Sequence, residues 1–336
     1  MVRNHLVSRS SELLCVGQYG AAQRILDMDP EGCAQDPRAA LLAARIQAHK
    51  FLDERAPDGD VRSAREALRS AIKDAGLSAE DRAEGLKSLA RVEGAINDRA
   101  AEVQTLEELC ALQPQGVYNP MILGNAYRMT QRFEEAWSCY ETAWSEVKTQ
   151  ESTDRQALTT LLLNMADLAV SQGSDRAKVG VALDRLAEHD RIAAAHFRGQ
   201  DHFRRGEWGA AIEAYNGAIR DSRQGATTAI PEPHIVCGLA LALRHAGKPE
   251  EALTTLEQAM VSARAPQTVI SPRVTLERAI CHAVMGQVGR AAELLDVLAH
   301  DTESPPSLAA TYREYVRNEP AFQRLRQEGT MPAVFV

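Results

Sequence analysis

Three histidines that lie close together in the sequence are the first candidates for chemistry. His189, His196 and His202 fall within one short stretch, and imidazole is a common ligand for metal ions. A metal site needs further ligands, yet neither a cysteine nor a pair of carboxylates joins these histidines at ligand spacing. We therefore expect solvated or packed imidazoles, with metal binding as the less favoured alternative, and we predict no metal centre.

Nucleophilic catalysis has equally little support. The pattern Ser-x-x-Lys occurs at Ser70–Lys73 and at Ser145–Lys148, but both copies lie on polar faces of expected helices and lack the companion motifs of that enzyme class. No glycine-rich dinucleotide loop, phosphate-binding loop, His-Glu-x-x-His or Gly-x-Ser-x-Gly motif occurs. We predict a protein that is not an enzyme and uses no cofactor.

The cysteines stand singly, and none forms a Cys-x-x-Cys pair. Several fall on apolar stripes of expected helices, which favours buried small hydrophobic residues in a reducing compartment over disulfides or metal ligands. The six are Cys15, Cys33, Cys110, Cys139, Cys237 and Cys281.

The composition indicates a helical protein without a polyanionic or lipid partner. The chain has 336 residues, of which 45% are hydrophobic and only 5% aromatic, a balance that favours closely packed helices. A net charge of -8 disfavours nucleic-acid binding, which depends on basic surfaces. The N-terminal stretch lacks a signal-peptide core, and the longest apolar run, Val236–Leu243, is too short to span a bilayer. We expect a cytoplasmic protein.

The helices that would position the candidate residues are clearest in the stretch Gly199–Ala218. One helix carries Gly199 and ends at Gly206; a second begins at Trp208 and places Ala211, Tyr215 and Ala218 on one stripe. The small residues allow close approach of two helices, and the tyrosine fills the gap between them.

Comparable helical pairs recur along the chain. Their central turns at Gly206, Gly247 and Gly286 are about 40 residues apart, a spacing typical of repeat proteins. A third pair is expected to turn near Gly94. The other predicted helices or pairs are Leu6–Cys15 with Ala21–Met28, Pro37–Lys50 with Val61–Ile72, Ala79–Val92 with Asn97–Leu112, 119–146, Leu158–Ser171 with Arg176–His189, His234–His245 with Pro249–Ala263, Pro272–Val284 with Val288–Leu298, and Ser307–Arg317 followed by Pro320–Glu328.

The chain resembles the tetratricopeptide-repeat family. The family pattern pairs Leu-Gly-x-x-Tyr in a first helix with Ala-x-x-x-Phe-x-x-Ala in a second. Its closest copy here joins 123–127 to Ala136, Tyr140 and Ala143, and 199–218 is the next best. The repeats run longer than the family's usual length of about 34 residues.

The resemblance implies an all-α, right-handed solenoid of about eight helical hairpins with a C-terminal capping helix. We divide it into degenerate repeats at 1–114, a tetratricopeptide array at 115–300, and capping helices with an apolar tail at 301–336.

In this family the first helices line a concave groove that binds a protein or peptide. Carried over by motif position, the groove residues are Tyr118, Met121, Asn125, Arg128, Asn164, Asp167, His196, Gln200, Phe203, Arg204 and Arg244. Asn125 and Asn164 match the asparagine spacing of chaperone-binding carboxylate clamps. The positions of the clamp's cations hold uncharged residues, which argues against that ligand.

Arg91, Arg128, Arg204 and Arg244 recur near the ends of first helices. They fit either a basic strip for an acidic peptide or complements to helix dipoles, with the second slightly favoured. The resemblance implies a peptide-binding scaffold or adaptor. A peptide-responsive sensor and a non-catalytic accessory subunit of an enzyme are alternatives, and a homo-oligomer formed through the tail Met331–Val336 stays open.

Overall fold

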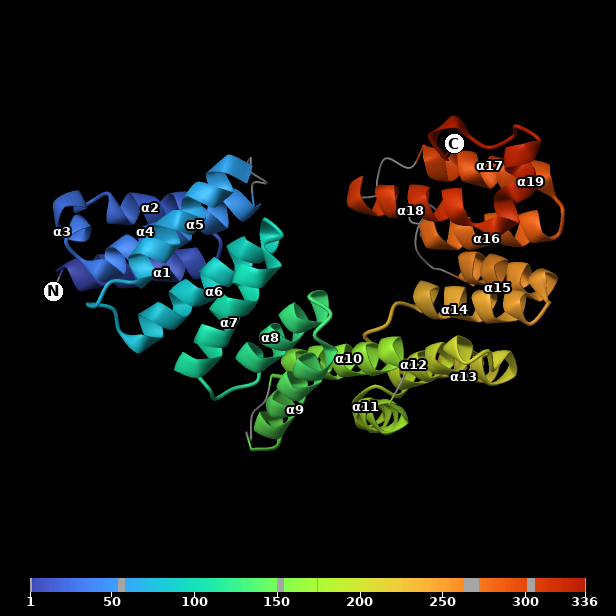
Figure 1. Ribbon diagram of the computed structural model, residues 1–336, viewed down its shortest axis with the longest axis horizontal. Helices are drawn as coiled ribbons and strands as arrows, with labels where there is room; N and C mark the ends of the chain where they lie inside the picture. The colour runs from blue at the N-terminus through green and yellow to red at the C-terminus, as the bar shows by residue number, and fades with distance from the viewer. Residues whose placement is uncertain are drawn as a thin grey trace. The chain divides into compact units, whose positions relative to one another are not determined.

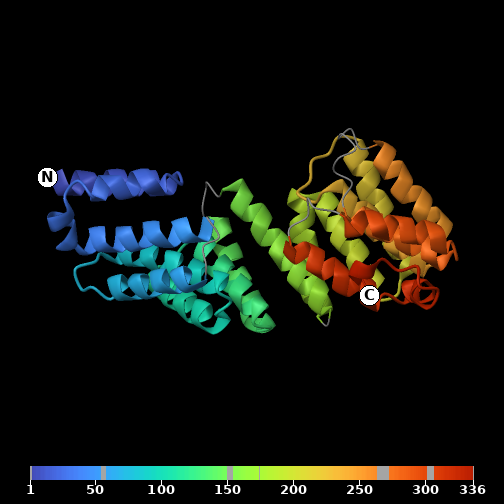
Figure 2. The same ribbon diagram turned by 90° about the horizontal axis from the view of Figure 1, so that it is seen from above.

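The computed structural model describes residues 2–53, 58–149, 154–173, 175–262, 272–300 and 306–335, and every regular element within these ranges is a helix. The chain divides into two compact units, Met1–Leu161 (unit 1) and Leu162–Val336 (unit 2), with the division inside α10 (Arg155–Gln172). Consecutive helices pack antiparallel as hairpins in each unit (Figures 1 and 2). None of the described helices is long and apolar enough to cross a lipid bilayer.

Unit 1 consists of four hairpins and one short additional helix. Its helices are α1 (Val2–Cys15), α2 (Tyr19–Leu26), α3 (Pro30–Ala34), α4 (Pro37–Asp53), α5 (Asp58–Ile72), α6 (Ala79–Ala95), α7 (Arg99–Leu112), α8 (Tyr118–Met129) and α9 (Phe133–Thr149). Helix α3 was not predicted, because Asp29-Pro30 ends a helix by its sequence. The same pair also begins one: Asp29 accepts a hydrogen bond from the Gly32 amide, and Pro30 occupies the first turn.

Unit 2 contains the α12–α13 hairpin (residues 191–223), which carries the second-best copy of the motif after the α8–α9 hairpin of unit 1. Its further helices are α11 (Arg176–His189), α12 (Arg191–Arg204), α13 (Trp208–Arg223), α14 (Glu232–His245), α15 (Pro249–Ser262), α16 (Pro272–Val284), α17 (Val288–Ala299), α18 (Pro306–Asn318), η2 (Pro320–Phe322), α19 (Gln323–Gln327) and η3 (Ala333–Phe335). The predicted bounds of α11 and α16 are the observed ones.

The hairpin turns require one residue with positive φ. Gly206 fills this position with φ 74°, and the amide of Glu207 then closes the turn on the carbonyl oxygen of His202. In the third hairpin Asn97 (φ 59°) has this role, and Gly94 lies inside α6. The prediction of a turn near Gly94 was therefore displaced by three residues, because asparagine also tolerates the left-handed region.

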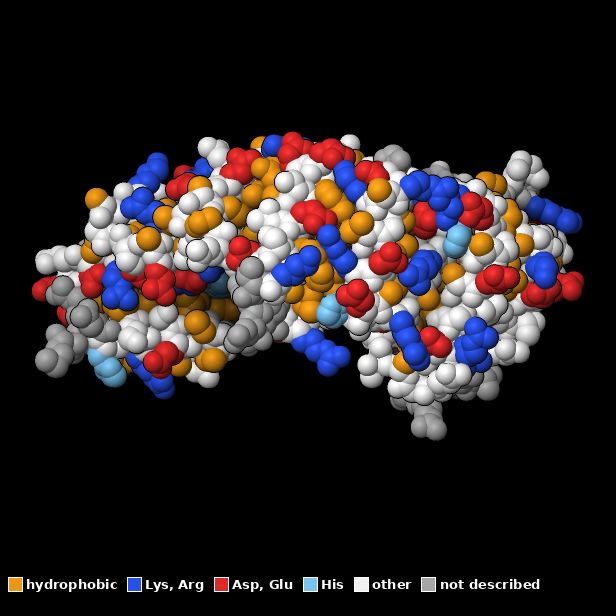
Figure 3. All heavy atoms as spheres, turned by 90° about the horizontal axis from the view of Figure 1, so that it is seen from below, with side chains coloured by type: hydrophobic (Ala, Val, Ile, Leu, Met, Phe, Trp, Pro, Cys, Tyr) orange, Lys and Arg blue, Asp and Glu red, His pale blue; other side chains and the backbone are white. Residues whose placement is uncertain are grey.

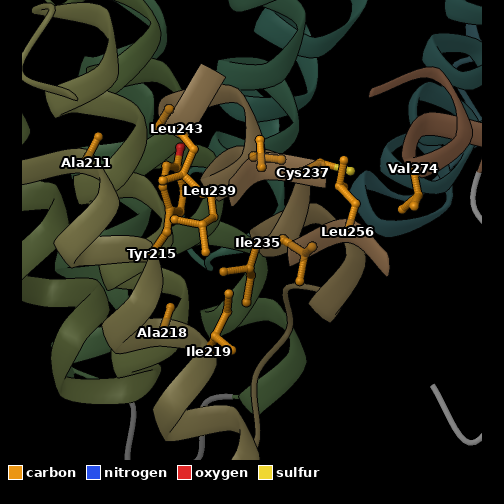
Figure 4. Close-up of a cluster of buried hydrophobic side chains, with 14 of the residues drawn as sticks. Ala211, Tyr215, Ala218, Ile219, Ile235, Cys237, Leu239, Leu243, Leu256 and Val274 are labelled. Atoms are coloured by element: carbon orange, nitrogen blue, oxygen red, sulfur yellow. The ribbon is translucent and has the colours of Figure 1, made fainter. Parts of the chain in front are cut away.

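Glycines of the first helices make room for tyrosines of the second helices. A Cβ atom on Gly124 would lie 2.6 Å from the ring of Tyr140. In unit 2 the ring of Tyr215 is held between two glycines, since a Cβ on either Gly199 or Gly238 would approach it to 2.7 Å. Figure 4 shows Tyr215 among the aliphatic side chains that continue this core between α13, α14 and α15.

The C-terminal segment closes the end of unit 2. Val316, Phe322, Leu325, Met331 and Phe335 are buried against α16 and α17. The apolar tail is thus part of the core of unit 2, and its two largest side chains are not exposed for self-association. The described part of the tail ends at Phe335, so Val336 lies outside it.

Candidate functional site: the surface of the first helices

In unit 1, three of the predicted groove residues differ in their exposure. Tyr118 is 49% exposed, and its hydroxyl donates to Asp154 at 2.6 Å; this hydrogen bond raises the pKa of Tyr118 and lowers that of Asp154. Met121 is only 5% exposed and packs in the interior. The Asn125 side-chain oxygen accepts a hydrogen bond from Tyr140 at 2.6 Å, which ties this amide to the core tyrosine of its own hairpin.

The remaining predicted residues near the middle of the chain are half-buried and engaged in contacts. Arg128 belongs to unit 1, whereas Asn164 and Asp167 belong to unit 2. That Asn125, Arg128, Asn164 and Asp167 line a peptide-binding groove stays a prediction.

In unit 2, the first helices α12, α14 and α16 pack side by side, α12 on α14 and α14 on α16. Side chains of neighbouring first helices contact each other. The rings of Phe203 and His245 meet edge to face with 5.1 Å between centroids, and the Arg244 guanidinium lies 3.9 Å from the Glu277 carboxylate. We call the set His196, Gln200, Phe203, Arg204, His234, Arg244, Arg273 and Glu277 the first-helix surface of unit 2.

His196 is the most buried polar member of this surface on α12. It is 6% exposed and lies against Tyr215 and Phe197, while Gln200 contacts its Nε2 at 2.9 Å. Burial, reinforced by the positive charge of Arg273 and by His234, lowers the pKa of His196 to about 4. The imidazole is therefore neutral at pH 7, which fits the expectation of a packed histidine.

This shift predicts a pH effect on stability. Because the pKa of His196 is about 4 in the folded chain and 6.5 in its ordinary state, the unfolded chain binds more protons between these values. The contribution of His196 is present above pH 6.5 and is lost as the pH falls toward 4. Relative to His196→Gln, wild type should lose about 1–2 kcal/mol of unfolding free energy between pH 7 and pH 5. Urea unfolding at both pH values measures this loss. His300→Gln, which changes an exposed histidine, is the control. A difference in unfolding free energy between wild type and His196→Gln that is the same at pH 7 and pH 5 contradicts the prediction.

The recurring arginines do not form one free basic strip. Arg91 is ion-paired with Asp53 at 3.0 Å, and Arg244 with Glu277, whereas Arg204 is exposed. Burial raises the pKa of Glu277, and the nearby arginines oppose this shift. Acidic and basic side chains are interspersed over the face shown in Figure 3. At these two positions the structure supports local charge compensation over free cations.

Sequence reasoning missed several polar partners and one hollow. Arg273 and Glu277 come from α16, which has no strong first-helix motif; their periodic spacing on that helix was the available signal.

A hollow of about 870 Å³ in unit 1 lies between α2, α4 and α5. Alanine is the most frequent residue type in its lining, and alanines on a helix indicate ordinary packing when only the sequence is considered; these are Ala40, Ala43, Ala44, Ala67 and Ala71. Among the described residues, no group of three His, Cys, Asp or Glu side chains is placed to hold a metal ion.

Comparisons with known proteins agree with this architecture. No family model and no curated protein matches the chain. The fold is similar to that of a tetratricopeptide repeat protein from Parabacteroides merdae, with a TM-score of 0.55, 14% identity, and coverage of 81% of this chain and 96% of the other. It is also similar to yeast Tom70, with a TM-score of 0.56, 14% identity, and coverage of 93% of this chain and 62% of Tom70. By its hairpins, its glycine–tyrosine contacts and these likenesses, the chain is a protein of the tetratricopeptide-repeat fold.

Proposed function

We propose that this protein is a non-catalytic scaffold that binds a segment of a partner protein on the first-helix surface of unit 2. The observation that carries the proposal is the row of polar and aromatic side chains that connects α12, α14 and α16. Phe203 contacts His245 across α12 and α14, and Arg244 contacts Glu277 across α14 and α16. A surface built on packed helices is already ordered before it binds, so a ligand bears less of the entropic cost of association.

The chemistry of this surface suits an extended peptide. Gln200 offers an amide that both donates and accepts, Arg204 and His234 are exposed, and Phe203 offers a partly exposed ring. Backbone amides of an extended peptide need both donors and acceptors, and apolar side chains need rings to pack against. The proposed partner is a protein of the cytoplasm, and the proposed binding involves no nucleic acid, membrane or cofactor.

The test is capture of peptides by the full chain. A library of N-acetylated, C-amidated dodecapeptides is passed over immobilised wild type and over Arg204→Ala/His234→Ala, in which two exposed side chains of the first-helix surface are removed. We expect the retained peptides to bind the double variant about 5- to 10-fold more weakly, because charged and polar contacts are lost.

The matched control removes the same residue types from second helices or their ends. Arg220 and His300 are both exposed, so Arg220→Ala/His300→Ala should retain the peptides as wild type does. Capture of no peptide, or equal retention by both double variants, contradicts the proposal.

A further inference from the structure

The hollow of unit 1 runs along one helix and has two further helices as its walls. Its floor is α4, from Pro37 in the first turn to Phe51 in the last, and its walls are α2 and the C-terminal half of α5. At a rise of about 1.5 Å per residue, this stretch of α4 is about 20 Å long. Alanines on the floor and on the α5 wall keep the space open, because each presents only a methyl group.

Two cations gather at one end of the hollow. The hydroxyl of Tyr19, at the start of α2, donates to the Asp53 carboxylate at the end of α4, so these two helix ends are adjacent. Lys50 lies in the last turn of α4. The Arg24 guanidinium lies back over Gly20, where a Cβ atom would be 3.8 Å from it. Both cations line the hollow and are exposed, and neither forms an ion pair with a described residue.

The other end of the hollow carries an acid. Asp74 lines the hollow just after α5, and the nearby Gly76 lies against Pro37 at the start of α4, with 3.0 Å between a Cβ placed on the glycine and the proline ring. At the first end, the carboxylate of Asp53 is already paired with Arg91. The hollow thus has free positive charge at one end and a carboxylate at the other. In a chain of net charge -8, this local pair of cations favours an occupant with acidic groups.

The backbone around the hollow favours a helical occupant over an extended one. The lining residues lie in helices, apart from Asp74, and backbone groups in a helix bond to one another. The lining therefore offers no strand edge to an extended peptide, whose own backbone groups would be buried without regular partners. A helix satisfies its backbone internally, and a groove lined by small apolar residues accommodates its apolar face.

We infer that the hollow of unit 1 is a docking site for an amphipathic α-helix of a partner protein, in addition to the first-helix surface of unit 2. The docked helix packs small apolar side chains against the alanines of α4 and α5. It places acidic side chains beside Arg24 and Lys50 and a basic side chain beside Asp74. A fatty acid would match the cations but would leave Asp74 without a partner.

The probes are helical peptides of about 16 residues with both ends blocked, long enough to span the hollow. Each carries a Lys in one terminal turn and two Glu in the other, in both orientations, with Ala, Leu, Ile and Met randomised at helical spacing between them. Peptides retained by the immobilised full chain are made again with Gln in place of both Glu. By fluorescence anisotropy, the Gln analogues should bind wild type about 10-fold more weakly.

Three variants separate the charges from the apolar lining. Arg24→Gln/Lys50→Gln should weaken the Glu peptides about 10-fold and leave the Gln analogues unchanged. Arg62→Gln/Lys248→Gln lowers the net charge equally at exposed positions outside the lining and should change neither. Ala40→Trp fills the hollow from an exposed position on its floor and should weaken both peptides more than about 10-fold, with the circular dichroism spectrum of wild type.

Retention of no helical peptide, equal binding of Glu and Gln peptides, or a preference for Glu that persists in Arg24→Gln/Lys50→Gln overturns the inference. Binding of palmitate in place of the peptides would assign the hollow to a lipid, and a dimer that Ala40→Trp dissociates would assign it to a second copy of the chain. Either result also overturns the inference. The proposed function is unaffected by all of these outcomes, because its test changes Arg204 and His234 of unit 2.

Discussion

Tyr215→Ala is expected to lower the unfolding free energy of unit 2 by about 3–5 kcal/mol, because it empties a site that is closed on both sides. The ring fills the gap between Gly199 on α12 and Gly238 on α14, and neither glycine has a side chain that can move into the space. The loss is a large share of a typical domain stability. Hydrogen exchange of the α12–α15 amides in the full chain should accelerate more than 100-fold, which corresponds to about 3 kcal/mol.

Two controls separate packing from general damage. Tyr315→Ala removes a tyrosine that is 42% exposed in the same unit and should cost about 1 kcal/mol or less. Gly199→Ala should destabilise wild type, because its Cβ would lie 2.7 Å from the Tyr215 ring, and should be neutral or stabilising in the Tyr215→Ala background. Equal costs for the two tyrosine variants, or additive costs for Gly199 and Tyr215, contradict this packing.

Arg69→Leu should cost unit 1 about 3 kcal/mol. Glu93 is fully buried in α6, where its carboxylate accepts from Arg69 at 2.7 Å and from the Thr105 hydroxyl at 2.6 Å. Removal of the arginine leaves a buried anion with a single neutral donor, and such losses are among the most destabilising that charge changes produce. Urea unfolding of the full chain, with hydrogen exchange to locate the effect in α5–α7, measures it.

Comparison with two further variants decides whether burial is the cause. Arg69→Leu/Glu93→Leu removes both charges and should recover most of the lost stability. Arg9→Leu breaks an ion pair with Glu12 in which both side chains are more than half exposed, and it should cost less than about 1 kcal/mol. A double variant as unstable as Arg69→Leu contradicts the assignment.

The first-helix surface of unit 2 could be predicted only in part from the sequence. Motif positions selected Arg244 and His196, and both lie on the first-helix surface of unit 2. The same positions also selected Met121, which is buried, because a motif gives the helix face and not the depth of each side chain beneath its neighbours. Glu277 joins this surface through its contact with Arg244, which links α16 to α14, and no local pattern encodes a contact between two separate hairpins.

Most of the helices, their pairing in hairpins and the tetratricopeptide-repeat fold could be predicted from the amino-acid sequence alone, and the short helix α3 could not. They follow from local features of the chain: a positive-φ residue in hairpin turns such as that at Gly206, side-chain caps at several helix starts, and the spacing that sets Gly199 against Tyr215. Which buried polar groups have hydrogen-bond partners depends instead on how the helices pack against one another. Asn125 accepts a hydrogen bond from Tyr140, whereas the corresponding Gln200 contacts His196, whose buried Nδ1 atom has no hydrogen-bond partner in the described part of the chain. The difference arises because hydrogen bonding in a packed interior depends on every neighbouring helix at once.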